Sequence, residues 1–264
     1  MDRVIPGLLL GAGWFALVFW GSVTMFWCVT LVGVLIALQE FFRMTCASLS
    51  GVRLFLTLLC CSLPVLAAWW PTPEAVLAGM AGSLLLIALL GLRSFSVDPD
   101  ILRYLLCSGF AVLYLPLCVA HLLLLRSLDK GPFWLALLVV IVAGSDIGAY
   151  YAGRRWGKKK IFPLLSPKKT GEGVLGGLAV GIVAAELFNL LFSSPVSFLS
   201  LLVAAALLIL VGIAGDLTES LLKRASGVKD SGTLLLGHGG ILDRVDSLLL
   251  SAPVLYYLIR CGAL

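Results

Sequence analysis

The feature that most constrains this chain is an uninterrupted run without a charged side chain, over residues 5–39. As a single helix this run would be about 50 Å long, whereas the hydrocarbon core of a bilayer is about 30 Å thick. The run must therefore fold back on itself, and the Gly21-Ser22 pair offers the natural place for a break. We expect two membrane helices here, the second of which ends near Glu40 and Arg43.

Further apolar runs fill the rest of the chain. Hydrophobic residues make up 61% of the 264 residues and charged residues 12%, and the mean hydropathy is +1.09. An ordinary soluble domain is only about 45–50% apolar. The expected fold class is therefore all-α, a polytopic integral membrane protein with about nine transmembrane helices. After the first two, the expected spans are 53–70, 74–92, 101–125, 133–151, 173–192, 197–213 and 241–259.

The polar segments between these spans are short, so we expect a single membrane domain. It divides into N-terminal membrane helices at 1–130 and C-terminal membrane helices at 131–264, and the second part carries the chemical motifs. The seven cysteines include no Cys-x-x-Cys pair, and most of them lie in or at the ends of apolar runs. We interpret them as small hydrophobic side chains rather than metal ligands or disulfide partners.

The distribution of basic residues predicts the orientation of the chain. With the N-terminus in the cytosol, sixteen of the nineteen Lys and Arg residues lie on the cytosolic side, and Arg126, Lys130 and Arg260 lie on the other. The opposite orientation would reverse this ratio, against the excess of basic residues that cytoplasmic loops carry. A basic loop at 154–170 and a polar stretch at 215–246 should therefore face the cytosol, where nucleotides are found.

The basic loop has two parts with different expected roles. A lysine-rich loop most often sets topology or holds anionic lipid headgroups, and this interpretation fits Arg154 to Lys160. A functional role is favoured for Lys168 and Lys169, because Ser-Pro-Lys-Lys-Thr-Gly is turn-forming and precedes a glycine-rich span. Close helix packing, rather than phosphate binding, is expected for the glycines of that span, Gly173, Gly176, Gly177 and Gly181. The loop at 91–100 is expected to be a plain solvated connector.

The polar stretch at 215–246 concentrates charge in a chain that has little. If residues 213–225 are helical, one face of that helix carries Asp216, Glu219, Ser220 and Lys223. Asp243 and Asp246 lie one turn apart at the start of the last apolar helix. Carboxylates from two helix ends can converge on one hard cation. Oxygen ligands without cysteine favour Mg²⁺, Mn²⁺ or Ca²⁺ over Zn²⁺.

Two explanations for this group of charges remain open. The carboxylates of Asp216, Asp243 and Asp246, if close together, would repel one another unless a cation lies between them. Alternatively, the neighbouring basic side chains of Lys223, Arg224 and Arg244 neutralise them. A divalent cation with basic side chains beside it is typical of phosphoryl or nucleotidyl transfer. The residues alone thus predict a metal-dependent enzyme that acts on phosphates at the cytosolic membrane surface.

Several motifs carry a more specific resemblance. In the polar stretch these are Ser220-Leu-Leu-Lys-Arg224, Lys229-Asp230 and His238-Gly-Gly-Ile-Leu-Asp-Arg-Val-Asp246. Upstream are Ser145-Asp-Ile-Gly-Ala-Tyr150 and Ser166-Pro-Lys-Lys-Thr170. Together they resemble the signature elements of the phosphatidate cytidylyltransferases, also called CDP-diacylglycerol synthases. The resemblance covers roughly residues 145–250, with departures from the family's usual residues at Ile147, Gly171 and Leu236.

The resemblance implies that the chain transfers the CMP moiety of CTP to phosphatidic acid, giving CDP-diacylglycerol and pyrophosphate. It also implies Mg²⁺ as cofactor, with K⁺ as a second cation. The expected catalytic residues are Asp216, Lys223, Asp243 and Asp246, of which Asp216, Asp243 and Asp246 are the expected metal ligands. The expected substrate-binding residues are Asp146, Lys168, Lys169, Ser220, Arg224, His238 and Arg244.

Two other functions share part of this pattern. A membrane kinase that phosphorylates a lipid alcohol from CTP would also need cations and carboxylates, but its hydroxyl nucleophile would require a base. A transporter or channel would place its functional charges near the bilayer midplane in two related halves, whereas here they gather in the C-terminal half. The expected partners are CTP, phosphatidic acid and membrane lipids, with no nucleic acid, and a homodimer is left open. The expected location is a bacterial inner membrane, with the active site facing the cytosol.

Overall fold

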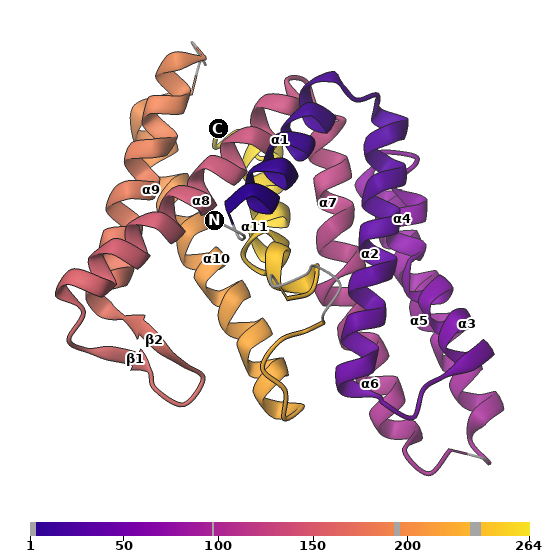
Figure 1. Ribbon diagram of the computed structural model, residues 1–264. Coiled ribbons are helices and arrows are strands. Elements are labelled where there is room, and N and C mark those ends of the chain that lie inside the picture. Colours follow the sequence, from indigo (N-terminus) through magenta and orange to yellow (C-terminus); the bar gives the residue numbers. More distant parts are fainter. Residues whose placement is uncertain (1–3, 97, 193–195, 233–238) are drawn as a thin grey trace. The chain divides into compact units, whose positions relative to one another are not determined.

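The computed structural model describes residues 4–96, 98–192, 196–232 and 239–264, with the backbone alone for residues 4–10. Within these ranges the chain forms eleven helices and one two-stranded hairpin (Figure 1). It divides into two compact units. The first unit comprises Met1–Gly131 and Ala225–Arg244, and the second comprises Pro132–Arg224 and Val245–Leu264.

The helices of the first unit follow one another with short connections. They are α1 (Val4–Trp20), α2 (Val23–Thr45), α3 (Gly51–Cys61), α4 (Leu63–Ala67), α5 (Pro73–Ser94), α6 (Ile101–Tyr114) and α7 (Pro116–Arg126). The chain breaks between α1 and α2 at Gly21-Ser22, as the sequence predicts. Ser22 is the N-cap of α2, and its hydroxyl accepts a hydrogen bond from the Met25 N–H at 3.1 Å.

Two of the expected spans are each built from two helices. The segment at 53–70 contains α3 and α4, with Pro64 in the first turn of α4. The segment at 101–125 contains α6 and α7, and Pro116 begins α7. Proline lacks an N–H and its ring clashes with the preceding turn, so it is tolerated at the start of a helix but interrupts a longer one.

The second unit carries the hairpin and the long helices of the C-terminal half. They are α8 (Gly131–Trp156), β1 (Lys160–Phe162), β2 (Ser166–Thr170), α9 (Gly171–Leu191), α10 (Phe198–Ala225) and α11 (Leu242–Arg260), which begins in the first unit. The antiparallel hairpin joins the ends of α8 and α9 (Figure 1). The sequence predicts a span at 197–213 and a polar helical face at 213–225, and α10 contains both in one continuous helix.

Glycines allow α8, α9 and α10 to approach closely. A Cβ at Gly176 of α9 would overlap the Ala152 Cβ of α8 and lie 2.9 Å from the Gly148 carbonyl oxygen. A Cβ at Gly181 would lie 2.7 Å from the Ile209 side chain of α10. The expectation that this glycine pattern serves helix packing is thus confirmed.

Six helical segments in the described ranges are long and apolar enough to cross a membrane: Val23–Thr45, Pro73–Ser94, Ile101–Arg126, Gly131–Trp156, Gly171–Leu191 and Phe198–Ala225. The chain is therefore a multi-pass membrane protein of the all-α class, with one short hairpin in the described residues. The expected count of nine spans is not confirmed. Gly11–Trp20 and Gly51–Cys61 are shorter apolar helices, and α11 carries Asp243, Arg244 and Asp246 near its start.

Candidate functional site

The polar face of α10 forms in the second unit as the sequence predicts. The Ser220 hydroxyl donates a hydrogen bond to Asp216 Oδ1 at 3.4 Å, one turn earlier on the helix. Lys223 Nζ lies 2.8 Å from Glu219 Oε2, also one turn apart. The Glu219 side chain is only 1% exposed, so this ion pair offsets the cost of removing its charge from water. Lys223 therefore stabilises a carboxylate of the same face.

Three carboxylates from α10 and α11 meet in this unit. Oxygen atoms of Asp216, Glu219 and Asp246 all lie within 4.8 Å of one another. The two helices approach closely here. A Cβ at Gly215 of α10 would overlap the Asp246 carbonyl oxygen, so only a glycine fits at this position. The Asp246 carboxylate is oriented by the Ser247 N–H, which donates to Oδ1 at 2.6 Å.

This carboxylate cluster suits a hard cation. Opposite oxygen ligands of Mg²⁺ lie about 4.2 Å apart, so a small side-chain movement would bring the three carboxylates to bonding distance. Without a cation their mutual repulsion must be relieved by protons or by basic side chains. The donor set is made entirely of oxygen atoms, which favours Mg²⁺ over zinc. The residues that are present thus fit Mg²⁺.

A pocket of about 270 Å³ shares Asp216 with the cluster. It is formed by the end of α8, strand β2, the start of α9 and the neighbouring parts of α10 and α11. Its polar lining consists mainly of Ser145, Asp146, Lys168, Lys169, Asp216 and Ser247. Two motifs, at 145–150 and 166–170, are therefore combined in one cavity with Asp216 of the polar stretch.

Lys169 connects the hairpin to the cluster. Its Nζ lies 2.6 Å from Asp216 Oδ2 and 3.5 Å from the Ile213 carbonyl oxygen. Lys168 lines the same pocket and is exposed. One basic side chain therefore neutralises part of the acidic charge already, and a second is available to an anion in the pocket.

Two side chains fix the hairpin to the start of α9. Thr170 caps the helix, and Glu172 binds the backbone just before β1. The Thr170 hydroxyl accepts a hydrogen bond from the Gly173 N–H at 3.1 Å. Glu172 Oε2 accepts from the N–H groups of Lys158 at 3.1 Å and Lys159 at 3.3 Å. These contacts hold β2, and with it the two lysines of the pocket, in one position.

Asp243 lies in the first unit and has partners of its own there. Its Oδ2 accepts hydrogen bonds from the Ser231 hydroxyl at 2.7 Å, the Ser231 N–H at 3.1 Å and the Gly240 N–H at 2.8 Å. The carboxylate therefore folds the segment that precedes α11, and its role as a metal ligand stays a prediction. Arg224 and Arg244 are exposed, and His238 lies outside the described residues.

Two glutamates take part in these arrangements without having been predicted to do so. Glu219 lies on the polar face that the sequence reveals, so its spacing from Asp216 was a usable signal for a third carboxylate. Glu40 is buried at the end of α2 and accepts hydrogen bonds from the backbone at the start of α11. No spacing rule connects positions 201 residues apart, so this contact could not be predicted from the sequence.

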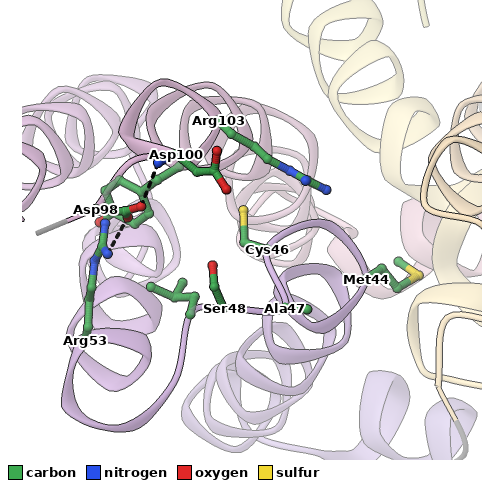
Figure 2. Close-up of a pocket in the computed structure, with 10 residues that line it drawn as sticks. Met44, Cys46, Ala47, Ser48, Arg53, Asp98, Asp100 and Arg103 are labelled. Carbon is green, nitrogen blue, oxygen red and sulfur yellow. Dashed lines mark hydrogen bonds and ion pairs between the residues drawn. The ribbon is translucent and has the colours of Figure 1, made fainter.

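A second polar pocket, of about 210 Å³, lies in the first unit, and Figure 2 shows it. The Arg53 guanidinium donates to Asp98 and lies over the Tyr104 ring, 4.4 Å from its centroid. The Arg53 hydrogen bond lowers the pKa of the Asp98 carboxyl, and a hydrogen bond from the Asp100 N–H adds to this effect. The connector at 91–100 is thus tied to α3 rather than simply solvated. Arg103 and Asp100 balance the remaining charge, so the pocket has no basic excess for a polyphosphate.

Comparison with known proteins connects these motifs to one family. The sequence model of the cytidylyltransferase family matches residues 1–262. A phosphatidate cytidylyltransferase of Bacillus subtilis (strain 168) is 42% identical over 150 residues, which is 56% of this chain and 56% of the relative. One of Pseudomonas aeruginosa is 44% identical over 147 residues, 55% of this chain and 54% of the relative. One of Aquifex aeolicus (strain VF5) is 37% identical over 155 residues, 59% of this chain and 57% of the relative.

The chain thus spans about half the length of the curated relatives that it matches. The family match, by contrast, extends over nearly the whole sequence and confirms the resemblance that the motifs suggest. The chain belongs to the cytidylyltransferase family.

Proposed function

We propose that this protein transfers the CMP moiety of CTP to phosphatidic acid, forming CDP-diacylglycerol and pyrophosphate. The observation that carries the proposal is the carboxylate cluster of Asp216, Glu219 and Asp246, which shares Asp216 with a pocket lined by Lys168 and Lys169. The family and the names of its curated relatives support the same reaction.

The main obstacle to this reaction is the repulsion between two anions. An oxygen of the lipid phosphate forms a bond to the α-phosphorus of CTP, and the bond from that phosphorus to the pyrophosphate oxygen breaks. The second pKa of a phosphate monoester is about 6, so the attacking group is mostly dianionic at neutral pH and needs no strong base. Lys168 and Lys169 screen the phosphate oxygens, and Lys169 can turn from Asp216 to an incoming phosphate.

Asp216, Glu219 and Asp246 would hold Mg²⁺, which when bound withdraws charge from phosphate oxygens. Lys223 acts through Glu219, because their ion pair holds that carboxylate in the cluster. The proposal also includes Asp243 as a ligand and K⁺ as a second cation. Contacts to substrate are further proposed for Asp146, Ser220, Arg224, His238 and Arg244.

The same proposal includes a topology. The chain crosses a bacterial inner membrane nine times, with its N-terminus and its active site in the cytosol. The bacterial origin of the relatives and the excess of basic residues on one side support this arrangement. The division at residue 130 and a homodimer belong to the proposal too.

The test is an assay of the purified protein in detergent with CTP labelled in the cytosine ring, phosphatidic acid and Mg²⁺. We expect the label to enter the lipid extract, with one pyrophosphate released for each labelled lipid. Label that stays in the aqueous phase would overturn the proposal. A lipid alcohol kinase would instead release labelled CDP and give an unlabelled phosphorylated lipid, so the same assay separates the two enzyme functions.

A further inference from the structure

Glu40, near the C-terminal end of α2, is a charged residue with only 6% of its surface exposed. Its Oε1 accepts a hydrogen bond from the Ile241 N–H at 3.1 Å, and its Oε2 accepts one from the Leu242 N–H at 3.0 Å. The Ser231 hydroxyl lies 3.5 Å from the same Oε2. A buried carboxylate is costly unless it is hydrogen-bonded, and the two backbone partners of Glu40 lie at the start of α11.

The start of α11 lacks a cap in its own sequence. The first N–H groups of a helix have no partner within the helix, and a Ser, Thr, Asp or Asn at the N-cap usually supplies one. Here Ile241 immediately precedes the first helical residue, Leu242, and an isoleucine side chain cannot accept a hydrogen bond. Glu40 therefore supplies the missing acceptor from another helix, and its negative charge is also favourable at a helix N-terminus.

Asp243 completes the arrangement by accepting the Gly240 N–H at 2.8 Å. Three consecutive N–H groups, at positions 240, 241 and 242, are thus held by two carboxylates. One carboxylate is local and the other comes from a helix about two hundred residues earlier in the chain.

The surrounding chain leaves little space for any other position of Glu40. A Cβ at Gly232 would lie 2.7 Å from Glu40 Oε1 and 3.0 Å from its Cδ, and Glu40 atoms are its three nearest neighbours. A Cβ at Gly240 would overlap both Glu40 Oε2 and the Ser231 hydroxyl. Because hydrogen bonds hold the carboxylate, a side chain at either glycine would have to displace it from α11.

We propose that Glu40 is a positioning residue for the reaction, acting as the N-terminal cap of α11. It fixes the direction of the first turn of α11, which carries Asp243. The positioning role rests on the proposed function, because it is tested by turnover. The cap itself does not, because it can be tested in the protein without substrate.

Hydrogen exchange tests the cap directly. Exchange of the amides at 239–246 is compared in the wild type, Glu40→Ala and the matched control Glu74→Ala, an exposed glutamate in the first turn of α5, where Thr72 provides the cap. We expect exchange in this segment to be about 5-fold to 10-fold faster in Glu40→Ala and unchanged in Glu74→Ala. Exchange in α9 should remain as in the wild type. Unchanged exchange at 239–246 in Glu40→Ala would overturn the proposal, whether or not the protein is active.

Kinetics then test the positioning role. Residues that orient metal ligands typically affect metal affinity or activity by about 10-fold to 100-fold. Glu40→Ala should therefore lower kcat by that amount and raise the Mg²⁺ concentration for half-maximal rate, with KM for phosphatidic acid unchanged. Glu40→Gln, which keeps one carbonyl acceptor, should lie between Glu40→Ala and the wild type. A higher KM for phosphatidic acid with normal Mg²⁺ dependence would contradict positioning of α11.

A second substitution checks the route of the effect. Gly232→Ala should reproduce the Glu40→Ala phenotype, because the new methyl group displaces the carboxylate. In the Glu40→Ala background the same change should have little further effect, since the obstructing side chain is gone. If the two substitutions together lower kcat by the product of their separate effects, the proposal is overturned. An inactive wild type would remove the proposed function but leave the exchange experiment valid.

Discussion

Substitution of Asp246 gives the most direct test of the candidate site. Asp246→Asn keeps the oxygen that accepts the Ser247 N–H but removes the negative charge from the cluster with Asp216 and Glu219. Loss of a group that only orients a metal ligand costs about 10-fold to 100-fold, so loss of a ligand itself should reduce turnover by more than about 100-fold.

Thermal unfolding in detergent should show that the Asp246→Asn variant remains folded. Asp129→Asn, an exposed aspartate between α7 and α8, is the matched control and should retain full turnover. Turnover of Asp246→Asn at the wild-type level would remove the carboxylate cluster from the mechanism.

Lys169 gives a second prediction at the same scale. Hydrogen bonds to charged groups contribute about 1.5–3 kcal/mol, so Lys169→Ala should raise KM for CTP by about 10-fold to 100-fold. Lys158→Ala removes an exposed lysine just before the same hairpin, on the side expected to face lipid headgroups, and should leave KM for CTP unchanged. Equal effects of the two substitutions in steady-state assays would assign Lys169 to general surface charge.

The sequence predicts these residues to different degrees. Helical spacing places Asp216 and Glu219 on one face, and the turn-forming motif at 166–170 is enough to single out Lys169. The contact between Lys169 and Asp216 could not be predicted, because it depends on how the hairpin packs against α10. The partners of Asp243 were equally hidden, since a short polar segment gives no sign of whether its carboxylate binds a cation or its own backbone.

At the scale of elements, the packing of α8 against α9 is testable through Gly176. In Gly176→Ala the added methyl group would overlap Ala152, and overpacking of this kind costs about 1–3 kcal/mol. Gly171→Ala in the same helix is the control, because nothing lies within 4 Å of its Cβ position. We expect thermal unfolding in detergent to occur at a lower temperature for Gly176→Ala alone. An equal shift in both variants would argue against close packing at Gly176.

The ion pair that ties the α5–α6 connector to α3 predicts a pH dependence. The hydrogen bond from Arg53 lowers the folded-state pKa of Asp98 below the ordinary value of 3.8. The pair therefore stabilises the fold above that pH, and its contribution is lost as the pH falls through the lowered pKa. Asp98→Asn should unfold at a lower temperature than the wild type at pH 7, and the difference should shrink toward pH 3.

Asp100→Asn is the control for the Asp98 experiment. It removes a carboxylate from the same pocket but keeps the N–H that donates to Asp98. If the unfolding temperatures of the wild type and Asp98→Asn differ by the same amount at pH 7 and at pH 3, the charge of Asp98 does not stabilise the fold.

Elements were predictable where one local signal dominates. The break at Gly21-Ser22 and the start of α11 before Asp243 follow from apolar run lengths and polar residues, and the structure agrees with both. The divisions at Ser62 and at Leu115 depend on how far a proline interrupts an apolar run, which run length alone does not reveal. The β hairpin was missed because its strands are short and mostly exposed, so no alternating hydrophobic pattern marks them.

For the whole molecule, composition alone establishes a multi-pass helical membrane protein. The number of crossings is a harder problem, because α3 and α4 are individually short and α11 begins with charged residues. The two compact units divide near residue 131, but residues 225–244 belong to the first unit. No sequence signal predicts that exchange, since it depends on contacts such as those of Glu40 with the start of α11.

The central claim is that Asp216, Glu219 and Asp246 together hold a divalent cation for chemistry on a nucleotide triphosphate. Mn²⁺ binding to the purified protein, followed by electron paramagnetic resonance in the presence and absence of CTP, tests it most directly. We predict that the wild type binds Mn²⁺ and that Asp246→Asn binds it at least about 10-fold more weakly. Equal Mn²⁺ affinity in the two proteins would contradict the claim.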